Sequence, residues 1–435
     1  MAISGWFVLL LALGAVPTIG AGLWGLVGWL GLCAVLLVVE LIVAGSPRRL
    51  VITRELPSRV RLGEAVASRL LVENRGRRTV RGVLRDAWDP SAGARPARRR
   101  IAIPAGERRA STTTLTPIRR GERQSAHVTV RSYGPLRLAA RQATMRAPGT
   151  IRVLPPFHSR RHLPSLLARL RELDGRTTVM IRGQGTEFDS LREYVRGDDV
   201  RSIDWRATAR RRDASGGVRL VVRTWRPERD RRVVLVVDSG RTSAARIADE
   251  PRLDTSFEAS LLLGALATRA GDRVDLLVYD RRVRGRVQGA TGADLLSKMV
   301  DAMAPIEAEL IETDWSLVPG LVRQVTPHRA LVVLLTSIDT PGAARSMLAM
   351  LPELTQRHTV VVASVTDPGI LEAAADRSDR DAVYRAAAAE RALLDATRVA
   401  AAIRQSGGEV VAAAPLELPR ALADRYISLK AAGRL

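Results

Sequence analysis

Residues 233–242 have the sequence VVLVVDSGRT, in which an apolar run ends abruptly on Asp238. Such a run predicts a buried strand of a parallel sheet, whose carboxyl end is the edge where α/β proteins bind ligands. Carboxylate and hydroxyl oxygens are the ligands that Mg²⁺ prefers. The sequence therefore predicts an Mg²⁺ site to which Asp238 and Thr242 contribute.

This row of residues is similar to the metal-ion-dependent adhesion site of von Willebrand factor A domains. There the pattern Asp-x-Ser-x-Ser is joined by a Thr from a second loop and an Asp from a third. The resemblance implies Thr313 as the second-loop hydroxyl and Asp339 as the third-loop carboxylate. Gly240 replaces the middle hydroxyl and Arg241 adds a positive charge beside the predicted cation. The alternative is a strand-end Asp that only caps the next turn.

Enzymatic alternatives find less support. Haloacid-dehalogenase phosphotransferases carry Asp-x-Asp-x-Thr at a strand end, with the second Asp as general acid, but Gly240 stands at that position. His158 and His162 have helical spacing without an acidic companion, which argues against zinc. The sequence contains no nucleophile elbow, Walker loop or Cys/His cluster. We expect no catalytic residues and no organic cofactor.

A dense polar block occupies residues 182–210, RGQGTEFDSLREYVRGDDVRSIDWRATAR. Its first two glycines resemble a dinucleotide loop, but Glu187-Phe188 follows where the third glycine belongs. Its alternating charges favour either a salt-bridged scaffold or a partner-binding surface. The residues that we expect to form it are Gly183, Gly185, Glu187, Phe188, Arg192, Tyr194, Gly197, Asp198, Asp199, Arg201, Asp204, Trp205 and Arg210.

The same block resembles the signature of the domain of unknown function 58 family. Arg119-Arg120-Gly121, Gly134-Pro135-Leu136 and the closing residues 429–435 extend the resemblance over most of the chain. It implies a bacterial membrane protein with two spans, a β-rich region and a von Willebrand factor A-like domain. It also implies a MoxR-type AAA+ ATPase as partner, with the A-like domain presenting client proteins or regulating the ATPase.

The amino-terminal region is apolar up to its first charged residue, Glu40. A hydrocarbon core of ~30 Å takes about 20 helical residues, so this length predicts two membrane spans. We place them at about residues 3–19 and 23–44, separated at Pro17, Gly20 and Gly22. A cleaved signal peptide would have a basic start and one shorter apolar core.

Arg48 and Arg49 follow the second predicted span, and the short loop between the spans carries no basic residue. The positive-inside rule then places both ends of the chain in the cytoplasm. We expect a protein of the bacterial cell membrane whose soluble domains are cytoplasmic.

The formal net charge is +23, carried almost entirely by arginine. Nucleic acid is one partner that such a charge suggests, but aromatic residues make up only 4% and offer few platforms for stacking bases. We therefore expect no nucleic acid, and we expect attraction to the anionic inner leaflet of the membrane.

The remaining chain shows two kinds of periodicity. Residues 50–154 alternate apolar and polar positions between turn residues, which predicts an antiparallel β-sandwich. Later, apolar runs of about six residues alternate with amphipathic segments, which is typical of a doubly wound sheet. These runs are residues 233–237, 274–279, 330–335, 359–365 and 409–413.

We accordingly expect a multidomain protein with two transmembrane helices, a β-sandwich-like domain and an α/β doubly wound von Willebrand factor A-like domain. The expected divisions are residues 1–47 for the helical hairpin, 48–155 for the β-rich domain, 156–228 for the helical and polar signature segment and 229–435 for the A-like domain.

The expected function is that of a non-enzymatic, membrane-anchored adaptor or chaperone-like assembly factor. It would act with a MoxR-type ATPase and a client protein through the Asp238 edge, with Mg²⁺ as cofactor. The alternative is a structural, envelope-associated scaffold whose A-like domain binds no metal.

Overall fold

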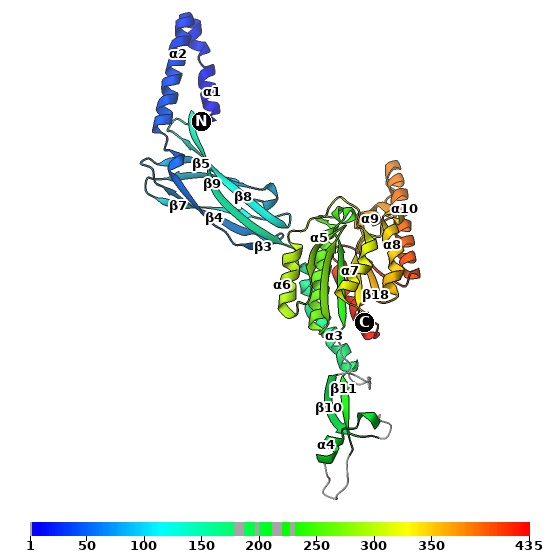
Figure 1. Ribbon diagram of the computed structural model, residues 1–435. Coiled ribbons are helices and arrows are strands. Elements are labelled where there is room, and N and C mark those ends of the chain that lie inside the picture. The colour runs from blue at the N-terminus through cyan, green and yellow to red at the C-terminus, as the bar shows by residue number, and fades with distance from the viewer. Residues whose placement is uncertain (1, 178–186, 196–199, 211–219, 227–230) are drawn as a thin grey trace. The chain divides into compact units, whose positions relative to one another are not determined.

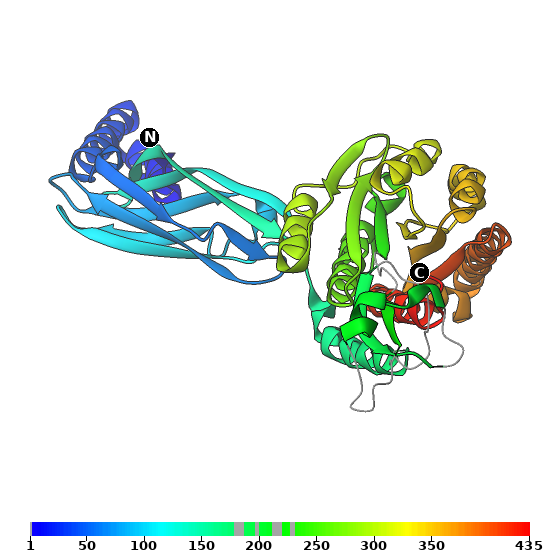
Figure 2. The same ribbon diagram turned by 60° about the horizontal axis from the view of Figure 1, so that its bottom comes forward.

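The computed structural model describes residues 2–177, 187–195, 200–210, 220–226 and 231–435 (Figures 1 and 2). The chain divides into two compact units, residues 1–156 and 157–435. The first unit contains the apolar helices and two β-sheets. The second contains a mostly parallel β-sheet with helices on both faces.

Two apolar helices, α1 (Gly5–Ala12) and α2 (Ala15–Val43), open the first unit. Inside α2, Gly22 has a φ of 57°, a left-handed conformation that glycine adopts without steric cost and that interrupts the helix. The indole N–H of Trp29 donates to the Leu10 carbonyl over 3.0 Å, so the chain after Gly22 returns alongside α1 (Figure 1).

Within the described ranges, one helical stretch, Gly22–Arg49, is long and apolar enough to cross a membrane by length and composition, and Gly5–Pro17 is a shorter apolar helix. The break expected at Gly22 is therefore present. A second crossing stays a prediction.

Two sheets pack face to face in the rest of the first unit. The larger sheet has the order β1-β9-β8-β5-β6, with β3 added beside β9, and the smaller has the order β2-β4-β7. Alternate buried residues such as Leu70, Val72, Val128 and Val130 fill the space between them, as the period-2 pattern predicts. The strands are β1 (Ala2–Ile3), β2 (Leu50–Glu55), β3 (Arg59–Arg61), β4 (Val66–Asn74), β5 (Val80–Trp88), β6 (Arg98–Ile103), β7 (Arg108–Leu115), β8 (Gly121–Tyr133) and β9 (Ala139–Leu154).

A buried ion pair joins the two sheets. The Arg54 guanidinium donates to both carboxylate oxygens of Asp86, over 2.9 and 2.8 Å, and the side chains are 4% and 1% exposed. Ser68, Ser125 and the indole N–H of Trp88 complete the hydrogen bonding. This satisfied network compensates for the removal of two charges from water.

The second unit is built on a six-stranded sheet of order β16-β15-β12-β17-β18-β19. Four of its five strand pairings are parallel, and β16 joins β15 antiparallel at one edge. The apolar runs predict the parallel strands closely. These strands are β12 (Arg232–Asp238), β15 (Arg273–Tyr279), β16 (Val283–Val287), β17 (Leu331–Leu335), β18 (Thr359–Val365) and β19 (Glu409–Ala413).

Helices cover both faces of this sheet (Figures 1 and 2). Residues of β12 alternate between the faces, so that Val234 and Val236 join the core formed with α7, α8 and α10. On the other face α5 is buried along nearly its whole length and packs against α3, α6 and α11. The helices are α3 (Leu163–Thr177), α5 (Arg252–Arg269), α6 (Gly292–Met303), α7 (Val318–Val325), α8 (Pro341–Thr355), α9 (Pro368–Ala375), α10 (Arg380–Gln405) and α11 (Leu418–Ala431).

The closing residues of the chain have a structural role. The Lys430 ammonium donates to Asp272 over 2.9 Å, both side chains being buried, and the Tyr426 hydroxyl donates to the other oxygen of Asp272. Arg434 pairs with Glu409 on β19 over 2.6 Å. The carboxyl-terminal segment thus fastens α11 to the end of α5 and to the sheet edge.

Candidate functional site

The strongest candidate site lies where β12 ends, at the carboxyl edge of the sheet. The chain continues from β12 to β15 on one side, while β17 lies on the other. The connection after β12 leads to β15, whereas the connection after the neighbouring strand β17 leads to β18, away from β12. Open α/β sheets form a ligand-binding crevice where two such connections run in opposite directions. The last residue of β12 is Asp238.

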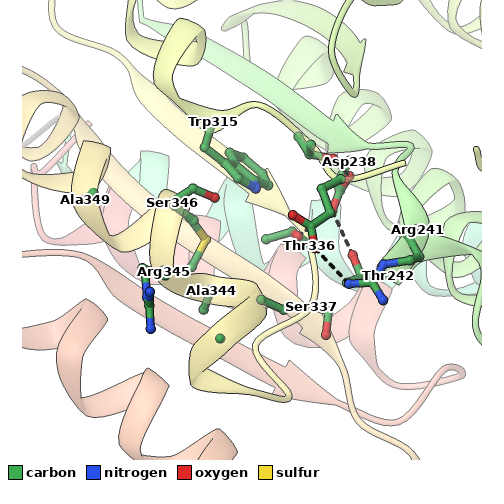
Figure 3. A pocket seen from close by; sticks show the side chains of 15 residues that line it. Asp238, Arg241, Thr242, Trp315, Thr336, Ser337, Ala344, Arg345, Ser346 and Ala349 are labelled. Carbon is green, nitrogen blue, oxygen red and sulfur yellow. Dashed lines mark hydrogen bonds and ion pairs between the residues drawn. The ribbon is translucent and has the colours of Figure 1, made fainter. Parts of the chain in front are cut away.

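Three hydroxyl groups converge on the Asp238 carboxylate (Figure 3). Thr242 and Thr336 donate to Oδ2 over 3.1 and 2.7 Å, and Thr313 donates to Oδ1 over 2.5 Å. The backbone N–H of Gly240 adds a fourth bond, to Oδ1, over 2.8 Å. Four donors to one carboxylate make a preorganised polar centre.

The Asp238 side chain borders a cavity of about 530 Å³ although the residue is only 2% exposed. The three threonines that donate to this carboxylate line the same cavity. A group that enters the cavity therefore meets the carboxylate together with its hydroxyl donors. The cavity has the size typical of small-ligand sites.

The structure brings together Asp238, Thr242 and Thr313 by hydrogen bonds, whereas Asp339 is paired with Arg252 and is not among the residues that line the cavity. The Asp339 carboxylate accepts a hydrogen bond of 2.6 Å from Arg252, a guanidinium that is 5% exposed at its side chain. Arg252 also donates to the Thr242 carbonyl over 3.1 Å. A buried cation thus holds the predicted third-loop carboxylate. Thr336, the residue just after β17, occupies the third-loop position instead.

Gly240 is required by the close approach of the Thr313 loop. A Cβ atom at position 240 would lie 2.3 Å from the Thr313 hydroxyl and 2.9 Å from the Ile311 carbonyl. The space of the missing middle hydroxyl is therefore filled by Thr313. The charge of neighbouring Arg241 is balanced by Glu312, 3.0 Å away in an exposed pair.

The oxygen atoms of this centre fit a hard divalent cation in kind. Mg²⁺ takes carboxylate, hydroxyl and water oxygens and is often held by only one or two carboxylates. Asp238 supplies one carboxylate and the three threonines supply hydroxyls. In the part of the chain that the structure describes, no three His, Cys, Asp or Glu side chains are grouped as metal ligands. A cation here would depend on hydroxyls and water.

The opposite wall of the cavity is formed by the first turns of α8, including Arg345 and Ser346, while Trp315 is a mostly buried aromatic wall (Figure 3). Arg241 and Arg345 supply the cavity's positive charges. The walls therefore combine hydroxyls, guanidinium groups and an aromatic ring, a mixture suited to a polar or acidic protein segment.

A second strand-end acid, Asp280 after β15, is held by a different set of donors. It is fully buried and accepts hydrogen bonds from Ser239 and from the backbone N–H groups of Arg281 and Arg282. Arg284 pairs with it over 3.0 Å. Asp280 is not among the residues that line the cavity beside Asp238.

The polar signature block contributes strand β10 (Glu187–Glu193) and helix α4 (Trp205–Arg210). Strand β11 (Val221–Arg226), later in the chain, pairs antiparallel with β10 and contacts α4. Asp204 caps α4 by accepting from the Arg206 and Ala207 N–H groups. It also pairs with Arg223 over 2.8 Å. The Ala207 N–H and then Arg223 hold the pKa of Asp204 below its usual range.

The other signature residues have varied positions. Glu187 and Phe188 lie in β10 with Arg192, whose guanidinium donates to the Glu193 carbonyl, and Tyr194 follows the strand. Arg201 lies in a 3₁₀ turn, Val200–Ser202, and Arg210 ends α4. Trp205 is 65% exposed, which a scaffold role does not explain. The residues outside the described part of the chain are Gly183, Gly185, Gly197, Asp198 and Asp199.

Residues 190–374 match the family model described as a protein of unknown function, DUF58. The match begins in β10 and runs through most of the α/β sheet. Uncharacterized proteins of Mycobacterium bovis and Mycobacterium tuberculosis are 26% identical over 223 residues, covering 48% of this chain and 68% of theirs.

Solved structures resemble part of the chain only weakly. A CARDB domain from Pyrococcus furiosus covers 24% of this chain and 94% of its own, with 16% identity and a TM-score of 0.19. A β-glucosidase from Listeria innocua covers 23% of this chain and 16% of its own, with 18% identity and a TM-score of 0.15. Neither likeness bears on function.

Proposed function

We propose that this protein is a non-enzymatic, membrane-anchored adaptor that binds a partner protein in the cavity beside Asp238. The observation that carries the proposal is the convergence of three loop hydroxyls on one strand-end carboxylate at the wall of a cavity of about 530 Å³. The described lining of the cavity contains no His, Lys or Cys side chain that could act as a general base or nucleophile near neutral pH, which favours binding over catalysis.

The domain around this cavity is, in this proposal, a von Willebrand factor A-like domain. The order of the sheet, the strand-end Asp238 and the hydroxyls of Thr242 and Thr313 support this assignment. Asp238, Thr242, Thr313 and Thr336 would hold Mg²⁺. When bound, the ion would supply a coordination position for a carboxylate of the partner.

The proposed partner is a MoxR-type AAA+ ATPase or its client protein, as the resemblance to the domain of unknown function 58 family implies. The apolar helices α1 and α2 would anchor the chain as two spans, and Arg48 and Arg49 after α2 favour a cytoplasmic location for the soluble domains. The anchor would then keep the ATPase and its client near the membrane.

A second candidate function is an envelope-associated scaffold with a metal-free A-like domain. The specific observation in its favour is that every Asp238 oxygen already has two donors, while Arg252 holds Asp339. In that case the hydroxyl network only stabilises the loops at the sheet edge.

Co-purification from membranes tests the proposal. A MoxR-type ATPase of the same cell should be retained by the wild-type protein, and Asp238→Asn should reduce its recovery at least tenfold. Asp249→Asn is the matched control, since that exposed acid lies outside the cavity lining. Equal recovery with all three proteins would remove the cavity from the function and favour the scaffold.

A further inference from the structure

A second cavity lies in the first unit, where α2 meets the sandwich. It has a volume of about 650 Å³ and is lined by Val38, Leu41 and Ile42 of α2, by Ser46, Pro47 and Arg48 after the helix, and by Arg141 and Gln142 of β9. One half is thus aliphatic and the other half is polar and cationic. A phospholipid has the same division, since its acyl chain would match the aliphatic half and its charged headgroup the cationic half.

Arg141 places a positive charge at the carboxyl end of α2. Its guanidinium donates to the Ala44 carbonyl over 3.3 Å, at the end of the apolar helix. Arg48 lies one turn further along the chain and is exposed. Among the residues that the structure describes, neither guanidinium forms an ion pair. Both cations therefore remain available to an anion.

The orientation of α2 about its own axis leaves the aliphatic side chains of the cavity exposed. Glu40 is buried on another side of the helix, where its carboxylate accepts from the Leu136 N–H over 3.1 Å. A Cβ at Gly134 would lie 2.7 Å from the Glu40 carboxyl carbon, so the close contact needs this glycine. With Glu40 held there, Val38 and Ile42 stay 52% and 58% exposed.

We infer that this cavity binds one anionic phospholipid, with the headgroup phosphate between Arg48 and Arg141 and an acyl chain along Val38, Leu41 and Ile42. The inference rests on the membrane anchor of the proposed function, because a lipid reaches the cavity only from a bilayer. Cations next to the end of a membrane helix attract anionic headgroups by about 1 kcal/mol each, or roughly fivefold in affinity. Two such cations predict a preference of about 20- to 30-fold.

Native mass spectrometry of the full-length chain in detergent tests this inference with added phosphatidylglycerol. Wild type should retain one phosphatidylglycerol and little phosphatidylcholine, and Arg48→Gln with Arg141→Gln should weaken retention about 20- to 30-fold. The matched control is Arg99→Gln with Arg100→Gln, two exposed residues of β6 outside the cavity. Ile42→Trp, which fills the aliphatic half and keeps both cations, should also displace the lipid.

Equal lipid retention by wild type and the Arg48/Arg141 variant would overturn the inference. Displacement of phosphatidylglycerol by an equal concentration of inorganic phosphate would overturn it as well, because the aliphatic half would then contribute nothing. Extraction of membranes at alkaline pH separates this result from failure of the anchor. Release of wild type into the soluble fraction removes the anchor, whereas membrane retention without a bound lipid contradicts only this site.

Discussion

Replacing Gly240 by serine would restore the middle hydroxyl of the Asp-x-Ser-x-Ser pattern, yet the structure predicts that the change damages the site. The new Cβ would lie 2.3 Å from the Thr313 hydroxyl and 2.9 Å from the Ile311 carbonyl. Thr313 would have to move, and its hydrogen bond to Asp238 would be lost.

The size of the effect follows from these two costs. Overpacking costs about 1–3 kcal/mol, and a hydrogen bond to a charged group contributes about 1.5–3 kcal/mol. Because the two costs share one movement of Thr313, we expect a combined loss of about 3 kcal/mol rather than their full sum. In a domain of this size that loss lowers Tm by roughly 6–12 °C.

Thermal unfolding of the detergent-solubilised full-length chain provides the assay. Gly342→Ser is the matched control, since that glycine lines the same cavity and has open space where its Cβ would be. Combining Gly240→Ser with Thr313→Ala should cost less than the sum of the single changes, because the alanine removes the clashing hydroxyl. A Gly240→Ser protein with unchanged Tm and stronger Mg²⁺ binding would refute the reasoning.

Three further predictions follow from buried groups. Arg54→Met should lower the free energy of unfolding by about 3–5 kcal/mol in urea titrations, because Asp86 would stay buried without its cation; a loss below 1 kcal/mol would contradict this. Burial and then Arg357 hold the pKa of His358 below its usual value of 6.5. The unfolded chain therefore takes up this proton first, so stability should fall as pH drops below 6.5, and His358→Gln should flatten the decline by at most about 1.4 kcal/mol per pH unit. An identical pH profile in both proteins would oppose that assignment. Titration calorimetry with Mg²⁺ should give a saturable heat of binding for wild type and none for Asp238→Asn. The absence of a binding heat from wild type would favour the metal-free scaffold.

Much of the α/β sheet was predictable because its strands are buried on both faces. The runs at residues 233–237 and 359–365 differ from β12 and β18 by at most one residue at each end. The antiparallel edge strand β16 has the sequence VRGRV, which lacks a continuous apolar run. Edge strands with one solvated face give a weaker pattern, and this one was not predicted.

The candidate site was predicted less completely. Asp238 was evident because a carboxylate ends an apolar strand, and Thr242 lies within one turn of it. Thr336 was missed although it directly follows the neighbouring strand β17, since a single threonine carries little information without the sheet order. Asp339 was chosen by analogy with the adhesion-site pattern, and its pairing with Arg252, 87 residues away in the chain, could not be inferred from spacing.

The signature block shows another limit of the sequence. Its alternating charges suggested a network within the block, and among the residues that the structure describes Asp204 pairs with Arg223, which lies beyond the block in the chain. Asp204 also caps α4. Exposed Trp205 keeps a partner-binding surface as a prediction for this element.

Site-specific photocrosslinking from within the cavity tests the central claim most directly. A benzoylphenylalanine at position 346, where exposed Ser346 lines the cavity, should crosslink to the MoxR-type ATPase or its client in intact cells, and Asp238→Asn should abolish the product. The same probe at position 249, outside the cavity, should give none. Crosslinks of equal yield from both positions, or a position-346 product that survives Asp238→Asn, would contradict the account.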